Sequence, residues 1–212
     1  MSGGQLHTRG RRANLPIADC RLPVFSPGLR VGLFGGTFDP PHAGHVAVSR
    51  VALRALALDQ VWWLVSPHNP LKPHAPADLK RRIDAARRIT ADPRIKVTGI
   101  EAALGTTYTA ETLSRLRQVD CVWMMGADNL ATFHRWRDWR AIAAALPMAV
   151  FNRPQSALTA LASPAARTLW RFRHDPRDAA TLAGSRPPAW VFLPSPHVDL
   201  SSTTLRAATQ AS

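Results

Sequence analysis

Short apolar runs alternate with amphipathic segments along most of this chain, and this alternation limits the folds that it can adopt. The runs have the length and composition of buried strands, and we expect strands at residues 31–34, 61–65, 95–98, 121–125, 148–151 and 191–193. Strands that alternate with helices favour a parallel sheet with helices on both faces. The sequence therefore predicts an α/β fold built on a doubly wound, mainly parallel sheet.

The segments between these strands carry apolar residues at helical spacing. We expect helices at residues 46–58, 79–89 and 110–117, a helical stretch through 142–146, and helices at 158–172 and 201–209. The pattern is weakest from Gln155 to Pro188. Residues 1–29 carry Gly, Pro and Arg without apolar periodicity, which predicts a flexible basic N-terminal extension before one domain over residues 30–212.

The net charge of +13 favours anionic partners: nucleic acid, an anionic membrane surface or phosphorylated small molecules. A dense basic stretch from Lys80 to Lys96 is interpreted as the solvated face of a helix. Cys20 and Cys121 form no Cys-x-x-Cys pair, and no apolar run reaches the roughly 18 residues of a membrane span. We expect a cytoplasmic protein. The Arg-rich, acid-poor start also resembles an organellar transit peptide, which we rank below a plain extension.

The segment from Gly35 to His45 follows the first expected strand and reads Gly-Gly-Thr-Phe-Asp-Pro-Pro-His-Ala-Gly-His. In an open parallel sheet, ligands bind beyond the carboxyl ends of the strands. Adjacent glycines let the backbone approach a phosphate closely, and Thr37 adds a hydroxyl donor. His42 and His45 can face the same side at the start of the next helix, where backbone amides favour an anion. This spacing predicts a phosphate-handling site.

A second hydroxyl-rich segment, Ser201-Ser202-Thr203-Thr204-Leu205-Arg206, stands at the expected start of the last helix. By itself it is typical of a helix N-cap. Its hydroxyls can also donate hydrogen bonds to phosphate oxygens, and Arg206 follows on the same helix. Together with the first segment, it is a candidate for the far wall of one phosphate site.

Two more segments complete a set of four. Residues Thr107 to Leu113 read Thr-Tyr-Thr-Ala-Glu-Thr-Leu, and Met125 to Trp139 contains Gly-Ala-Asp-Asn-Leu and Phe-His-Arg-Trp-Arg-Asp-Trp. The first segment and the C-terminal one resemble the His-x-Gly-His and Ser-Ser-Thr-x-x-Arg motifs of a nucleotidyltransferase superfamily. All four together resemble bacterial nicotinate-nucleotide adenylyltransferases, over residues 30–206. The resemblance implies a Rossmann-like nucleotidyltransferase fold.

The resemblance also assigns site residues. It implies catalytic roles for His42, His45 and Arg206, and ATP binding by Gly35, Gly36, Thr37, Phe38, Ser201, Ser202 and Thr203. On the acceptor side, Thr109 and the backbone near Tyr108 would address the nicotinate carboxylate, and Trp136 would stack on the pyridine ring. Further acceptor contacts are implied for Asn69, Lys72, His74, Asp128 and Arg153. Residues 66–74 depart from the commoner Pro-Asn-x-x-Pro-Pro-His pattern, so the basic residue on the acceptor phosphate stays open.

Core packing is the alternative for the two tryptophans, because residues three apart share a helix face. We accept core packing for Trp139. For Trp136, packing and stacking are equally favoured.

An acceptor phosphate is already an anionic nucleophile, so no general base is needed. The resemblance implies attack of nicotinate mononucleotide on the α-phosphorus of ATP, which yields nicotinate adenine dinucleotide and pyrophosphate in NAD biosynthesis. Since no carboxylate cluster in the sequence predicts a metal held by the protein, Mg²⁺ should arrive on the triphosphate. The expected partners are ATP and nicotinate mononucleotide, without nucleic acid or membrane. A monomer and a homo-oligomer both fit.

Two alternatives remain. Within the same superfamily, the acceptor could be nicotinamide mononucleotide or phosphopantetheine, although the Thr-Tyr-Thr segment and Trp136 favour a pyridine ring. From a different class, the net charge of +13 fits a basic RNA-binding protein. However, the sequence has no aromatic-rich RNP-like strand or other nucleic-acid motif.

Overall fold

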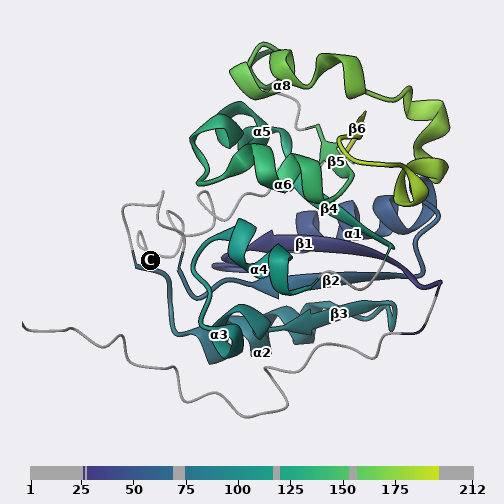
Figure 1. The fold of residues 1–212 in the computed structure, drawn as a ribbon. Helices are drawn as coiled ribbons and strands as arrows, with labels where there is room; N and C mark the ends of the chain where they lie inside the picture. The colour runs from purple at the N-terminus through teal and green to yellow at the C-terminus, as the bar shows by residue number, and fades with distance from the viewer. Residues whose placement is uncertain (1–25, 27, 69–74, 117–119, 153–156, 196–212) are drawn as a thin grey trace, which may run out of the picture.

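The computed structural model describes residues 26, 28–68, 75–116, 120–152 and 157–195. Its centre is a six-stranded sheet in the order β3-β2-β1-β4-β5-β6, in which every neighbouring pair is parallel (Figure 1). The strands are β1 (Arg30–Gly36), β2 (Gln60–Val65), β3 (Ile95–Thr98), β4 (Asp120–Gly126), β5 (Met148–Phe151) and β6 (Trp190–Leu193). All six predicted strands are present.

Helices cover both faces of the sheet, as expected for a doubly wound fold. One face packs against α1 (Ala43–Ala55), α2 (Leu79–Ile89) and η4 (Pro176–Gly184). The other face packs against α3 (Ile100–Leu104), α4 (Thr109–Arg115), α5 (Ala127–Thr132), η2 (Phe133–Arg135), α6 (Trp139–Ala145), α7 (Ala157–Leu161) and α8 (Pro164–Thr168). A short turn, η3 (Trp170–Phe172), follows α8.

Successive strand residues point to opposite faces of a sheet, and this alternation builds two separate cores. In β2, Trp63 belongs to the core beneath α1 and α2, whereas Trp62 and Leu64 belong to the core on the other side. Strands buried on both faces read as continuous apolar runs. This explains why the strands could be located from the sequence.

The helix predicted over residues 158–172 is wrong, because the chain forms α7, α8 and η3 there instead. Ser163 is the N-cap of α8 and accepts a hydrogen bond from the amide of Ala166 at 3.2 Å, and Pro164 occupies the first turn. A proline at this position begins a new helix and cannot continue the previous one. Helix α3 and η4 were not predicted.

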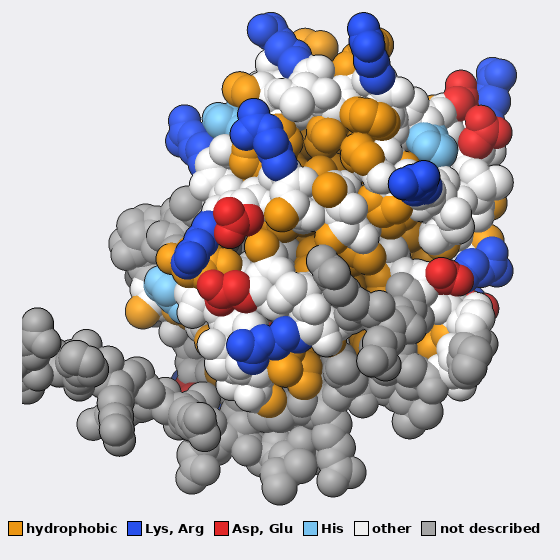
Figure 2. Space-filling view, viewed as in Figure 1, with side chains coloured by type: hydrophobic (Ala, Val, Ile, Leu, Met, Phe, Trp, Pro, Cys, Tyr) orange, Lys and Arg blue, Asp and Glu red, His pale blue; other side chains and the backbone are white. Residues whose placement is uncertain are grey.

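The predicted N-terminal extension at residues 1–29 and the predicted helix at 201–209 lie wholly or mainly outside the described residues. Within the described part of the chain, no helix is long and apolar enough to cross a membrane. Lys and Arg side chains are scattered over the face drawn in Figure 2 and form no continuous stripe there.

Candidate active site

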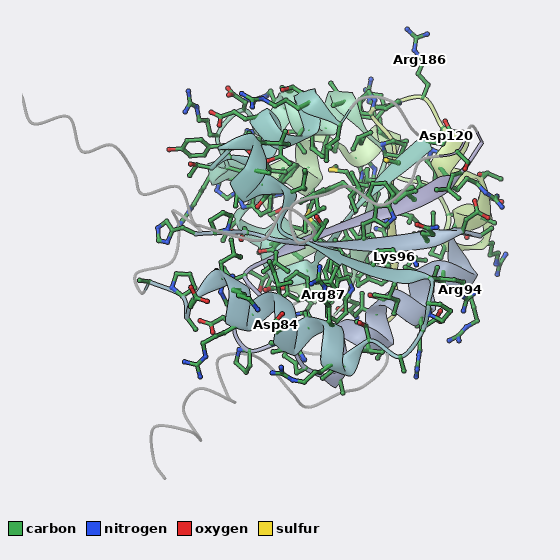
Figure 3. All side chains as sticks on the ribbon, turned by 90° about the horizontal axis from the view of Figure 1, so that it is seen from below. Asp84, Arg87, Arg94, Lys96, Asp120 and Arg186 are labelled. Atoms are coloured by element: carbon green, nitrogen blue, oxygen red, sulfur yellow. The ribbon has the colours of Figure 1, made fainter. Side chains whose placement is uncertain are left out.

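The predicted site lies where strands β1, β2 and β4 end. Gly36 at the end of β1 is paired with Val65 of β2, and the β1–β4 register continues toward Gly126. The loops that follow these three strands therefore meet at one edge of the sheet. Asp120 and Arg94, which stand at the amino ends of β4 and β3, mark the opposite edge in Figure 3.

The two histidines of the first segment lie together at the start of α1. The amide of Gly44 donates to Nδ1 of His42 at 3.1 Å, and the amide of His42 donates to Nδ1 of His45 at 3.2 Å. The ring centroids are 3.8 Å apart. These bonds cap the helix, which begins at Ala43, three residues before the predicted start, and ends at Ala55.

The same hydrogen bonds determine which nitrogen of each ring can donate. A neutral imidazole carries one N–H, and a nitrogen that accepts from an amide is not the protonated one. Both Nδ1 atoms accept, so the proton of each neutral ring is on Nε2. Each ring is therefore an Nε2–H donor when neutral, and a donor of this kind can stabilise charge on a phosphoryl oxygen.

The ring of His45 rests on a buried aromatic cluster. Its centroid is 4.8 Å from that of Phe38, and Phe38 is stacked on Trp63 at 4.7 Å. Phe38 has a φ of 47°, which is unusual for a residue other than glycine and marks a constrained turn. Trp63 Nε1 donates to Ser49 Oγ at 2.8 Å, and Ser49 Oγ donates to the carbonyl of His45 at 2.9 Å. The cluster thus holds both the ring and the backbone of His45.

Gly35 is needed by the protein's own packing, and Gly36 lies close to an aromatic ring. A Cβ on Gly35 would lie 2.4 Å from Cη2 of Trp123, and one on Gly36 would lie 3.3 Å from Cε2 of Phe38. From the sequence, close approach of a phosphate is one reason for these two glycines. At Gly35 the structure adds a second reason, which is that the Trp123 ring occupies the space of the missing side chain.

Gly35→Ala is accordingly expected to destabilise the fold by about 1–3 kcal/mol, the usual cost of overpacking a core. Trp123 is only 2% exposed, so its ring has little room to move away. Gly184→Ala is the matched control, because no heavy atom lies within 4 Å of its added Cβ. Urea unfolding of both variants would measure the difference. Equal stability of the two variants would contradict the packing explanation.

The acceptor-side candidates from two different segments lie close together. Tyr108 is the N-cap of α4 and Thr109 its first residue, while the guanidinium of Arg137 lies 4.7 Å from the centroid of the Tyr108 ring. Trp136 is partly buried and meets Phe133 edge to face at 5.4 Å. The segment that contains Thr107 to Thr109 is therefore joined to the one that contains Trp136.

Two further residues of the Met125–Trp139 segment are also described by the structure. Trp139 is 8% exposed and belongs to the core, which confirms the packing interpretation for that residue. Asp128 is exposed in the first turn of α5, just beyond the end of β4, at the same edge as Gly36.

A buried carboxyl beneath α4 was not recognised in the sequence. Glu101 is 7% exposed, and its Oε1 accepts from Thr112 Oγ1 at 3.3 Å. Thr112 Oγ1 lies 2.8 Å from Thr106 Oγ1, and the amide of Thr106 donates to the carbonyl of Glu101 at 3.0 Å. Burial raises the pKa of Glu101 to about 7, and the hydrogen bond from Thr112 partly opposes this. Through Thr106, this network holds the backbone just before Tyr108 in place.

The interpretation of the basic stretch Lys80 to Lys96 as a solvated face is wrong for Arg82. Arg82 is 2% exposed and points inward from α2, whereas Arg81, Arg87 and Arg88 of the same helix are exposed. Lys80 and Asp84 form an ion pair of 2.7 Å along the outer side of α2, where Asp84 and Arg87 are marked in Figure 3. Helical spacing explains the difference, because Arg82 shares the buried face with Leu79, Ile83 and Ala86.

Several predicted site residues lie outside the described residues: Asn69, Lys72, His74, Arg153, Ser201, Ser202, Thr203 and Arg206. In the part of the chain that is described, no three His, Cys, Asp or Glu side chains are grouped as a metal site would require.

Comparison with known proteins identifies the family of this chain. Residues 33–208 match the family model described as cytidylyltransferase-like. A Ruegeria pomeroyi protein is 53% identical over 191 residues, 88% of this chain and 90% of its own. A Rhizobium meliloti protein is 54% identical over 185 residues, 85% of this chain and 98% of its own. Both are named "Probable nicotinate-nucleotide adenylyltransferase".

A solved structure shares the fold. The Plasmodium falciparum nicotinic acid mononucleotide adenylyltransferase complexed with NaAD superposes with a TM-score of 0.63 at 13% identity. The match covers 84% of this chain and 83% of that one. At this identity the likeness concerns the fold alone.

Proposed function

This chain belongs to the cytidylyltransferase-like family and, within it, to the nicotinate-nucleotide adenylyltransferases, and we propose that it transfers AMP from ATP to nicotinate mononucleotide. The products are nicotinate adenine dinucleotide and pyrophosphate, so the reaction serves NAD biosynthesis. The observation that carries the proposal is the pair of imidazoles at the start of α1, whose Nε2–H donors are set by backbone hydrogen bonds.

The reaction is a direct displacement at phosphorus. An oxygen of the acceptor phosphate forms a bond to the α-phosphorus of ATP while the bond from that phosphorus to the bridging oxygen breaks, and pyrophosphate leaves. The nucleophile is already anionic, so no side chain has to remove a proton. Positioning and stabilisation of the developing charge are then the main catalytic tasks.

On the ATP side, we assign the turn Gly35 to Phe38 to the nucleotide and His42 and His45 to the phosphates. Their Nε2–H groups would donate to oxygens of the transferring phosphoryl group and stabilise the charge that builds there. The family resemblance adds Arg206 and the hydroxyls of Ser201, Ser202 and Thr203 to the same phosphates.

On the acceptor side, Thr109 and the backbone near Tyr108 would address the nicotinate carboxylate, and Trp136 would stack on the pyridine ring. The partly buried position of Trp136, with Phe133 against it, supports this role because a stacking residue needs one supported and one open face. Asp128 would hold the ribose or organise the pocket. Asn69, Lys72, His74 and Arg153 are the proposed contacts of the acceptor phosphate and pocket wall.

Nucleotidyltransferases of this family are associated with a divalent metal that accompanies the nucleotide. We propose that the metal is Mg²⁺ and that it arrives on the phosphates of ATP, where it would neutralise charge on the leaving pyrophosphate. We also propose that the enzyme acts in the cytoplasm.

The acceptor is tested by measuring pyrophosphate release from ATP with nicotinate mononucleotide, nicotinamide mononucleotide and phosphopantetheine in separate assays. We expect the highest kcat/KM with nicotinate mononucleotide. A preference for phosphopantetheine would overturn the assignment of the acceptor, while the absence of turnover with all three would overturn the activity.

A further inference from the structure

The buried side chain of Arg82 joins the loop that follows β1 to both ends of the loop between β2 and α2, at the edge of the sheet that carries the site. Its Nη1 donates to the carbonyl of Thr37 at 2.6 Å and to that of Ser66 at 2.8 Å. Its Nη2 donates to the carbonyl of Pro67 at 3.2 Å, and its Nε donates to that of Ala77 at 2.7 Å. One guanidinium thus binds both the carbonyl of Thr37, which is 45 residues away in sequence, and that of Ala77, which is five residues away.

These carbonyls occupy key positions around the site. Thr37 follows Gly36 and leads to His42, whereas Ser66 and Pro67 directly follow β2 and Ala77 precedes α2. Two further hydrogen bonds join the same segments. The amide of Ser66 donates to the carbonyl of Gly36 at 2.9 Å, and the amide of Ala77 donates to Asp39 Oδ2 at 3.2 Å.

The chemistry of this junction requires arginine. A guanidinium directs its N–H groups in a fixed plane, so it can serve several carbonyl oxygens that lie in different directions. Burial lowers the pKa of Arg82 from its ordinary value, while the nearby carboxylates of Asp39 and Asp78 oppose that effect. A lysine offers three donors on one nitrogen and cannot reach the same set.

We propose that Arg82 is a positioning residue for adenylyl transfer: it holds the turn from Gly36 to Asp39, and through it His42, in register with the loop that follows β2. The inference rests on the proposed function and assigns no direct contact between Arg82 and substrate. A displacement of about 1 Å at a reacting group can cost about 10²-fold in rate, so a loosened junction should appear in kcat.

The test compares Arg82→Lys and Arg82→Ala with Arg88→Ala, an exposed arginine on the same helix. Turnover is measured with ATP and nicotinate mononucleotide well below the unfolding temperature, and the folded fraction is determined by circular dichroism. We expect kcat per folded molecule to fall about 10–10²-fold in both Arg82 variants, by more than either KM changes, and to stay at the wild-type value in Arg88→Ala.

Chemical rescue separates positioning from simple stabilisation. Guanidinium ion at low millimolar concentration should restore part of the kcat of Arg82→Ala and leave Arg88→Ala unchanged, because the ion can occupy the space of the lost side chain. Wild-type kcat in folded Arg82→Lys, or no rescue of folded Arg82→Ala, would overturn the proposal. Inactive wild-type enzyme would instead overturn the proposed function.

If neither Arg82 variant folds, Asp39→Ala tests the same junction with the arginine intact. This change removes the hydrogen bond between the Ala77 amide and the Asp39 carboxylate. We expect kcat to fall about tenfold, since the turn would be held less firmly. A kcat equal to that of the wild type would overturn the proposal.

Discussion

Replacing His45 with alanine is expected to lower kcat by about 10²–10³-fold while the protein remains folded. The change removes an Nε2–H donor aimed at charge that develops in the transition state, and loss of one such donor has an effect of this size. It also removes the Nδ1 acceptor of the His42 amide, so the helix loses part of its cap at a cost of about 0.5–2 kcal/mol. Steady-state kinetics and urea unfolding measure the two effects separately.

Two matched variants make the result specific. His45→Asn keeps an oxygen that can accept from the His42 amide but has no donor at the position of Nε2. It should recover stability relative to His45→Ala and remain as slow. His174→Ala is the control. The amide of His174 donates to the carbonyl of Trp190, the first residue of β6, so this histidine lies at the edge of the sheet opposite the site and its loss should leave kcat at the wild-type value. Near-normal turnover in His45→Asn would contradict a donor role for Nε2.

The second large effect concerns stability as a function of pH and depends on Glu101. Burial raises the pKa of this carboxyl from 4.5 to about 7 in the folded protein. Because the folded protein holds the proton of Glu101 more tightly than the unfolded chain does, protonated Glu101 adds to the free energy of unfolding. This contribution is complete below pH 4.5 and is lost as the pH rises through about 7. The difference between these values corresponds to about 3 kcal/mol.

Glu101→Gln should remove this dependence, because the amide stays neutral and its oxygen can still accept from Thr112. The free energy of unfolding of the variant minus that of the wild type should therefore rise by about 3 kcal/mol between pH 4.5 and pH 8. Glu111→Gln is the control, because the Glu111 side chain is 43% exposed. A constant difference across this range for Glu101→Gln would contradict the buried, protonated carboxyl.

The fold was predictable where the sequence pattern is strong and local. Strand β5 was placed to the residue, because the run from Met148 to Phe151 is buried on both faces and is therefore apolar throughout. Apolar spacing over 158–172 favours one helix, but Ser163 and Pro164, whose combination is typical of a helix start, begin a new helix within it.

The sequence predicts that His42 and His45 lie together, but it does not reveal the buried side chains that support them. His42 and His45 stand three apart, so the helical repeat alone brings them together. Arg82 lies 45 residues from Thr37 and looks like one more basic residue of a surface helix, and its inward direction appears only once α2 is packed on the sheet. The roles of Glu101 and Ser49 were equally hard to predict. Their hydrogen-bond partners, Thr112 and Trp63, lie on other elements of the chain.

The most direct test of the central claim follows the α-phosphate of ATP. The enzyme is incubated with nicotinate mononucleotide and ATP that carries ³²P at either the α or the γ position, and the products are separated. We predict that the α label enters nicotinate adenine dinucleotide and that the γ label leaves in pyrophosphate in equal amount. Release of the γ label as orthophosphate, or an α label that never enters the dinucleotide, would contradict adenylyl transfer.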